Sequence, residues 1–274
     1  MKKNAPFLLL LPVALALLAS SCARVSVTEA MSRLYRAASL DSTLKQDYRR
    51  IAAEWPDRPY ASEEALTATE YLTLLAGGCV GEKHLEIIGE EGRTALVAEL
   101  PGRKKKEGII LICADITTEK DSSGVLIRSD EASCMAAVEV LRLFKAAKIT
   151  PDKTVHVVIR QKKAGSEGLG SYVEWLQERK EAGHDAGEVL LQVHLGSDGS
   201  LDPATFYIGE PGMIFEKIRE VLPPLFSPYG TYGFASMPRF VDHANLPAPY
   251  YRYRVTPETL AEDAAAVASL AFIN

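Results

Sequence analysis

The chain has 274 residues, with 31 Lys and Arg residues against 36 Asp and Glu residues, which gives a formal net charge of −5. This mildly acidic balance offers no basis for nucleic-acid binding, so we expect no nucleic-acid partner. Hydrophobic residues make up 47% of the chain, which is enough to bury a large core within a single domain.

The N-terminus has the pattern of a secretory signal. A basic start, Met1–Lys3, precedes the apolar run Phe7–Ala19, and small residues lead to Cys22. A cysteine in this place resembles the bacterial lipobox, whose cysteine receives diacylglycerol. We therefore expect a lipoprotein signal peptide over residues 1–21, and a mature protein that is exported and anchored to a bacterial membrane through lipid on Cys22. The alternatives are an ordinary signal peptide and a transmembrane anchor, but an anchor needs about 20 apolar residues.

After the signal, two segments are expected. Residues 22–56 comprise the lipidated cysteine, a tether and a helical lead-in, and residues 57–274 form one domain. The body after the signal holds three further cysteines, Cys79, Cys113 and Cys134, and this odd number forbids a complete disulfide framework.

Hydrophobic periodicity and Gly and Pro breaks predict alternating helices and strands. In chain order, we expect helices over 25–54 and 61–76, strands over 94–100 and 108–113, a helix over 131–147, a strand over 154–159, a helix over 167–180, a strand over 188–194, a helix over 211–221, a strand over 248–255 and a last helix capped by Thr256. The helix over 131–147 is amphipathic, with an apolar face of Met135, Val138, Leu141 and Phe144. The strands are apolar without alternation, which is typical of a mostly parallel sheet covered on both faces. The predicted fold is therefore an α/β, three-layer α/β/α sandwich, with ligands at the carboxyl ends of its strands.

Chemistry-bearing residues follow these strands in a definite order. Cys113-Ala114-Asp115 ends one strand, the loop motif Arg128–Cys134 runs into a helix, Gly168–Ser171 follows the next strand, and Val241-Asp242-His243 comes late. This order resembles the bacterial zinc aminopeptidase family, the co-catalytic di-zinc exopeptidases that include the glutaminyl cyclases. There the motifs H-x-D, G-x-D-D-x-x-S-G, E-E with G-L-x-G-S, and S-D-H occur in the same order. The resemblance runs from about residue 58 to the C-terminus and implies a zinc-exopeptidase-like fold.

The resemblance also implies a set of site residues. In that family two zinc ions share a bridging Asp, and a Glu beside them is the general base that acts on a metal-bound water. The matched positions place Asp130 at the bridging ligand, Cys113 at a His ligand and Asp115 at the Asp that orients this ligand. His243 and Glu167 are the other candidate ligands.

Two positions depart from the family pattern. The E-E pair falls on Lys162-Lys163-Ala164 in one register and on Ser166-Glu167 in the other, so the general base is missing in both. A lysine beside a zinc pair would repel it. The third metal Asp falls on Gln192, which is neutral and a poor zinc ligand.

Each candidate ligand also has a simpler structural explanation. Cys113 would be a buried core residue, Asp130 a helix N-cap, Glu167 a surface residue at a helix start, and His243 a loop residue if Asn245–Ala248 fixes the register. His156 and His194 lie in predicted strands and match no motif, so we expect them to have structural roles.

The degenerate site favours a catalytically inactive, peptidase-fold lipoprotein that binds a peptide, protein or envelope partner, with no cofactor expected. The alternative is a residual metallopeptidase or glutaminyl-cyclase-like enzyme with a single zinc, held by Asp130, Glu167 and His243, with Cys113 as a further candidate. A G-x-S-x-G elbow, an H-E-x-x-H motif and a phosphate-binding glycine loop do not occur. The aromatic residues expected around a binding cleft, or else in a long ordered loop, are Tyr229, Tyr232, Phe234, Phe240 and Tyr250.

Overall fold

The computed structural model describes residues 25–89, 95–104, 107–120, 122–124, 126–128, 131–161, 169–184, 187–196, 206–207 and 250–272. Its helices are α2 (Val27–Leu40), α3 (Leu44–Glu54), α4 (Glu63–Val80), α5 (Glu131–Ala147), α6 (Gly170–Glu181) and α9 (Leu260–Ser269), with short 3-10 turns η1 (Glu82–His84) and η2 (Leu270–Phe272). Its strands are β1 (Leu85–Ile88), β2 (Ala95–Leu100), β3 (Ile109–Asp115), β4 (Glu119–Lys120), β5 (Leu126–Arg128), β6 (Thr154–Arg160), β7 (Val189–Gly196), β8 (Phe206–Tyr207) and β9 (Tyr250–Arg254).

Seven of the described strands form one sheet in the order β1-β2-β6-β3-β7-β9-β8. The central strands β6, β3, β7 and β9 run parallel to one another, and β1 points in the same direction. Strands β2 and β8 run antiparallel to their neighbours. The expected mostly parallel sheet is confirmed, with these two reversed strands within it.

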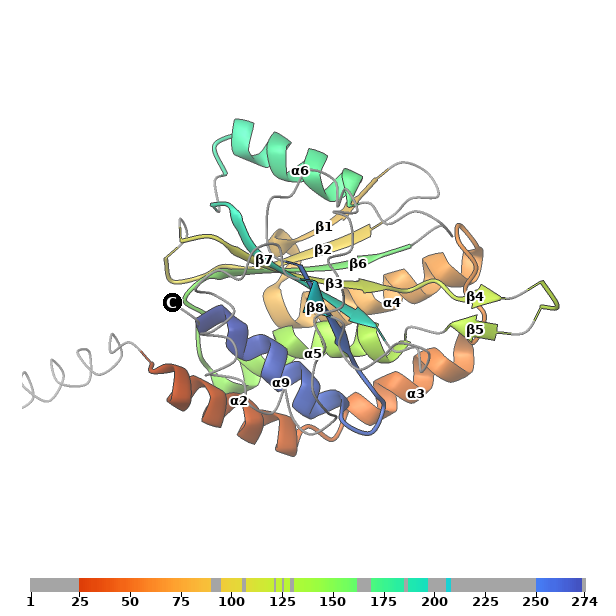
Figure 1. The fold of residues 1–274 in the computed structure, drawn as a ribbon, viewed down its shortest axis with the longest axis horizontal. Helices are drawn as coiled ribbons and strands as arrows, with labels where there is room; N and C mark the ends of the chain where they lie inside the picture. The colour runs from red at the N-terminus through yellow and green to blue at the C-terminus, as the bar shows by residue number, and fades with distance from the viewer. Residues whose placement is uncertain are drawn as a thin grey trace, which may run out of the picture.

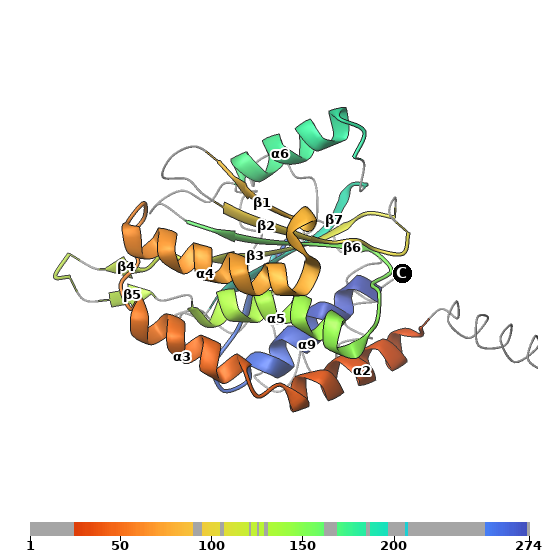
Figure 2. The same ribbon diagram turned by 180° about the vertical axis from the view of Figure 1, so that it is seen from behind.

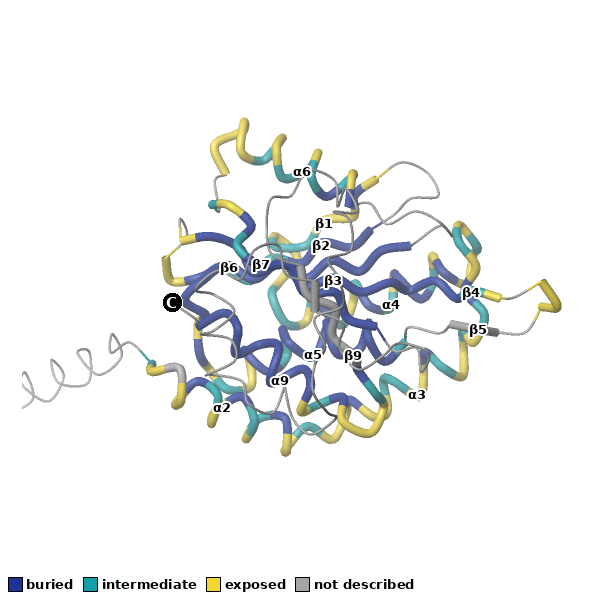
Figure 3. Tube along the Cα trace, in the orientation of Figure 1, coloured by how far each residue is buried: buried dark blue, intermediate teal, exposed yellow. Residues whose placement is uncertain are grey.

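A thick layer of helices covers one face of the sheet (Figures 1 and 2). Helix α5 lies at its centre and contacts β3, β6 and β7 as well as α2, α3, α4 and α9. The predicted apolar face of α5 is confirmed, because its four residues are at most 1% exposed. Figure 3 shows that α5 and the central strands lie in the buried core of the molecule. Helix α2 packs against α9, so the first and last described helices lie side by side.

Helix α6 covers the opposite face in the part of the chain that the structure describes (Figures 1 and 2). Leu169, Tyr172 and Trp175 pack there against sheet residues that include Val97 and Leu111. Burial of apolar side chains on both faces of the sheet confirms the expected three-layer sandwich.

The expected lead-in helix over 25–54 is in fact two helices, because the chain turns at Asp41. The Asp41 carboxylate accepts hydrogen bonds from the backbone N–H groups of Thr43 (2.6 Å) and Leu44 (3.2 Å), which satisfies donors at the start of α3. Buried residues of both helices belong to the main core cluster. The segment before residue 57 therefore packs as part of the fold.

The last helix begins one turn later than expected. Thr256 was expected to be its N-cap, but the Thr256 hydroxyl accepts a hydrogen bond of 3.4 Å from the backbone N–H of Thr259, within a turn that precedes α9. Pro257 lies in this turn rather than in the helix.

Parts of the expected organisation lie outside the described residues, namely the signal peptide, Cys22 and the helix over 211–221. Among the residues that are described, no helix has the length and apolar character that a bilayer crossing requires.

Candidate functional site at the strand ends

Polar side chains gather on the α6 face of the sheet, where β3, β6 and β7 end. Alternate residues of a strand share a face, and Leu111 and Cys113 of β3 belong to the α6-side core cluster, so Asp115 points to that face as well. In the register of the sheet, Asp115 pairs with Arg160 of β6, and Cys113 pairs with His194 of β7. We call Cys113, Asp115, Arg160 and His194 the strand-end cluster.

Asp115 is the centre of this cluster and is only 1% exposed. Arg160 donates from Nε to Oδ1 of Asp115 at 2.5 Å, and Nε2 of His194 lies 3.2 Å from Oδ2. Burial works against ionisation of Asp115, but the charges and hydrogen bonds of His194 and Arg160 outweigh it and hold its pKa well below the usual range. Asp115 is therefore a buried carboxylate held between two basic side chains.

Cys113 packs with the core residues on the α6 side of the sheet. Its side chain is buried, and burial raises the pKa of its thiol to about 12. The charge of Arg160 works against this rise, while that of Asp115 adds to it. This environment favours the protonated thiol.

Arg58 joins the segment before α4 to the end of β3 and to the start of α5, although no motif pointed to it. Its guanidinium is fully buried and donates to the carbonyl oxygen of Ile116 (2.8 Å), to Glu131 Oε2 (2.9 Å) and to the carbonyl oxygen of Trp55. These contacts fasten the turn before α4 to the end of β3 and to the first residue of α5. A single arginine in a Pro-rich break carries no sequence signal for such a role.

The other predicted site residues cannot be placed in this geometry. Asp130, Glu167 and His243 lie outside the described residues, and so does the Lys162–Ala164 stretch. Gln192 is buried in β7, where its backbone pairs with Leu111 and with Tyr250 of β9. Tyr229, Tyr232, Phe234 and Phe240 also fall outside the described residues. Within the described ranges, no three His, Cys, Asp or Glu side chains come together in a way that could hold a metal ion.

The two strand histidines differ in what they contact. His156 has the expected structural role, since its Nδ1 lies 2.7 Å from the Tyr172 hydroxyl and its ring packs edge-on against Trp175. Burial lowers the pKa of His156. His194 instead belongs to the strand-end cluster through Asp115, 79 positions earlier in the chain. Sequence reasoning missed this contact because it depends on β7 lying next to β3.

No protein-family model matches the chain, and no curated protein sequence matches it. Solved structures do match. A glutaminyl cyclase from an Acidobacteriales bacterium aligns with a TM-score of 0.58 and 11% identity, over 83% of this chain and 90% of that one. The aminopeptidase LapA of Legionella pneumophila aligns with a TM-score of 0.57 and 13% identity, over 88% and 71%. A dinuclear metal-binding peptidase of Bacillus subtilis aligns with a TM-score of 0.55 and 11% identity, over 85% and 98%. At these identities the likeness shows the fold, and it confirms the zinc-exopeptidase-like architecture expected from the motif order.

Proposed function

We propose that this chain is an exported, lipid-tethered protein whose peptidase-like fold binds a peptide or protein partner of the cell envelope and catalyses no hydrolysis. The observation that carries the proposal is the Arg160–Asp115–His194 contact. At the position where the resembling enzymes orient a metal ligand, the carboxylate of Asp115 already has one basic partner on each oxygen.

The described residues do not fit a zinc ion. The thiol of Cys113 replaces an imidazole, and burial raises its pKa to about 12, so the thiolate that zinc binds is costly to form there. The positive charge of Arg160 reaches both Cys113 and Asp115, and it would oppose a second cation in the same buried space. Gln192 stands at the matched position of the third carboxylate and is neutral, so this position adds no negative charge for a metal pair.

The proposed anchor would hold the domain close to the membrane. Helix α2 begins at Val27, only a few residues after Cys22. A connection this short reaches at most about 20 Å even when fully extended. A partner that this protein binds would therefore lie in the envelope, near the surface of the bilayer that holds the lipid.

The anchor can be tested separately from the site. We expect the Cys22→Ser variant to carry no lipid and to keep its signal peptide, because lipid attachment precedes cleavage at a lipobox. The intact masses of wild type and variant would check this. A wild-type chain without added lipid mass, or a variant that is cleaved like wild type, would contradict lipid anchoring at Cys22.

A residual single-zinc enzyme is the second candidate, favoured by the structural match to a glutaminyl cyclase. Its ligands would be Asp130, Glu167 and His243, with Cys113 as a further candidate. Among the described residues we identify no general base that would act on a metal-bound water.

Metal content separates the two candidates. The mature chain would be purified in detergent without chelator, dialysed against zinc and then against buffer, and analysed for metal per chain. Zinc near zero supports the non-catalytic proposal. About one zinc per chain that is lost in Asp130→Ala, but kept in the control Asp57→Asn at an ion pair with Lys120, would overturn it and justify assays of aminopeptidase and cyclase substrates.

A further inference from the structure

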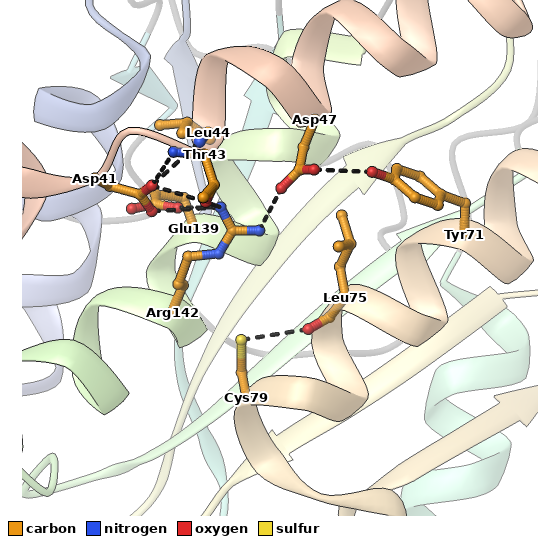
Figure 4. Close-up of polar contacts among 9 residues, drawn as sticks. All are labelled: Asp41, Thr43, Leu44, Asp47, Tyr71, Leu75, Cys79, Glu139 and Arg142. Atoms are coloured by element: carbon orange, nitrogen blue, oxygen red, sulfur yellow. Dashed lines mark hydrogen bonds and ion pairs between the residues drawn. The ribbon is translucent and has the colours of Figure 1, made fainter.

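A second polar cluster lies in the helix layer, on the other side of the sheet from α6, where α5 meets α3, α4 and the turn between α2 and α3. We call Arg142 and the three acids around it, Asp41, Asp47 and Glu139, the Arg142 cluster. Arg142 lies 2.7 Å from Asp47, 3.3 Å from Asp41 and 3.5 Å from Glu139. Figure 4 shows the three acidic side chains turned toward this one guanidinium.

The three acids differ in the hydrogen bonds that stabilise their carboxylates. Asp41 accepts hydrogen bonds from the backbone N–H groups of Thr43 and Leu44, and Asp47 accepts one from the Tyr71 hydroxyl at 2.9 Å. Glu139 is 0% exposed, and neither of its carboxyl oxygens has a hydrogen-bond partner among the described residues. One guanidinium neutralises one carboxylate, so Glu139 is the acid whose negative charge this junction tolerates least.

The groups around Glu139 come from every element that meets there. Asp41 belongs to the α2–α3 turn, Asp47 to α3, and Arg142 to α5 itself. Helix α4 contributes the Cys79 thiol, whose pKa is affected by the charges of Arg142 and Glu139. Lys145 bonds to the carbonyl oxygen of Gly78, and its charge also acts on Cys79. The charge balance at the junction thus depends on one arginine that the neighbouring acids share.

We infer that a proton on Glu139 controls how firmly the α2–α3 turn and α3 are held against α5. With the proton in place, one arginine serves the two aspartates. Without it, a third carboxylate faces Asp41 and Asp47 in a buried space, and the turn is pushed away from α5. This inference goes beyond the proposed function, because it concerns the segment between the membrane anchor and the sheet and does not depend on what the strand ends bind.

The direction of the pH effect follows from the pKa of Glu139. Burial raises this pKa from an ordinary value of 4.5 to about 8, the charges of Asp41 and Asp47 add to the rise, and Arg142 opposes it. If the junction opens, Glu139 meets water and returns to its ordinary pKa. The contact is therefore fully stable below about pH 4.5, and it weakens as the pH rises toward 8. Asp41, whose pKa is lowered, titrates below this window.

Hydrogen exchange of the mature chain, followed by mass spectrometry from pH 5 to pH 9, tests the inference. The peptide covering residues 41–51 is compared between wild type and Glu139→Gln at each pH, so that the intrinsic pH dependence of exchange cancels. We expect the opening constant of wild type, relative to the variant, to rise roughly tenfold per pH unit up to about 8 and then to level off. Glu54→Gln, a change at an exposed ion pair on α3, is the matched control and should behave as wild type. A ratio that is constant with pH overturns the inference.

A direct titration keeps the inference testable if Glu139→Gln folds poorly. The carboxyl carbon resonance of Glu139 in the wild-type chain should shift with a midpoint near 8, and Asp41→Asn should lower this midpoint because Asp41 raises the pKa. A midpoint at or below the ordinary value of 4.5 would show that Glu139 is already ionised at neutral pH, which overturns the inference.

Discussion

A carboxylate with 1% exposure persists as an ion only with charged or hydrogen-bonding partners, and Asp115 has one on each neighbouring strand. Arg160 comes from β6 and His194 from β7, so one side chain joins three adjacent strands at their carboxyl ends. The cluster thus stabilises the very edge of the sheet at which proteins of this architecture bind ligands.

Removal of Arg160 should show how much the pairing of Asp115 contributes to the stability of the fold. We expect Arg160→Met to destabilise the protein by about 3–5 kcal/mol, because it leaves Asp115 buried beside a weaker partner. Urea unfolding followed by circular dichroism would measure the loss. The double variant Arg160→Met with Asp115→Asn should recover part of it, and two fully additive losses would show that the pair is not coupled.

The same cluster should set the acid limit of stability. Because the folded-state pKa of Asp115 is depressed, its contribution is present above the unfolded pKa, about 3.9, and is lost as the pH falls through the lower folded pKa. Urea midpoints between pH 2 and pH 6 should fall less steeply for Asp115→Asn than for wild type. Parallel curves for the two proteins would argue against a paired carboxylate.

Only half of the strand-end cluster could be predicted from the sequence. The motif order placed Asp115 and Cys113 at a strand end, and the structure brings them there. His194 and Arg160 could not be assigned to Asp115 from the sequence, because their pairing depends on strand order and on register. A glutamate at position 139 inside an amphipathic helix is also ambiguous, since α5 is enclosed on almost all sides and not on one face only.

At the scale of elements, α6 is attached to the sheet by a compact set of directed contacts. Arg179 donates to Glu86 of β1 (2.6 Å) and to Glu99 of β2 (2.8 Å), and its guanidinium stacks over Trp175. The indole N–H of Trp175 donates to Glu86 as well, at 2.6 Å. These bonds orient α6 over the edge of the sheet formed by β1 and β2.

We expect Arg179→Ala to destabilise the protein by about 1–3 kcal/mol, because two charge-assisted hydrogen bonds and a cation–π contact are lost together. Amide exchange should accelerate most in the peptide covering residues 170–181. Lys180→Ala, at the exposed neighbouring position, is the control and should stay within about 0.5 kcal/mol of wild type. Equal effects at both positions would mean that α6 is held by its apolar contacts alone.

The apolar, non-alternating strands predicted the sheet well, because both of its faces are covered by helices. Strand β1 was not predicted. It is a short edge strand with two exposed residues in its middle, so it lacks the apolar signal of the central strands.

At the scale of the whole molecule, α9 completes the core. It packs on both α2 and α5, and the phenyl rings of Phe144 and Phe272 lie 5.9 Å apart at the end of this contact. Its buried residues include Leu260, Ala264 and Val267. The C-terminal segment is therefore part of the fold and not an appendage.

Deletion of residues 259–274 should abolish cooperative unfolding, because it removes a helix that is apolar over most of its surface and leaves its site on α2 and α5 open. A thermal melt followed by circular dichroism would check this, with deletion of residues 273–274 as the control. A truncated chain that still melts in one sharp transition would show that the core closes without α9.

The pairing of α2 with α9 also orders events during biogenesis. Translation proceeds from the N-terminus, so α2 is made well before its partner α9. Until α9 is made, the surface of α2 that α9 covers lacks this packing partner. In the exported chain proposed above, the core would stay incomplete until α9 is present. The polypeptide would therefore remain unfolded enough to pass through a secretion channel, and it would complete its folding after translocation.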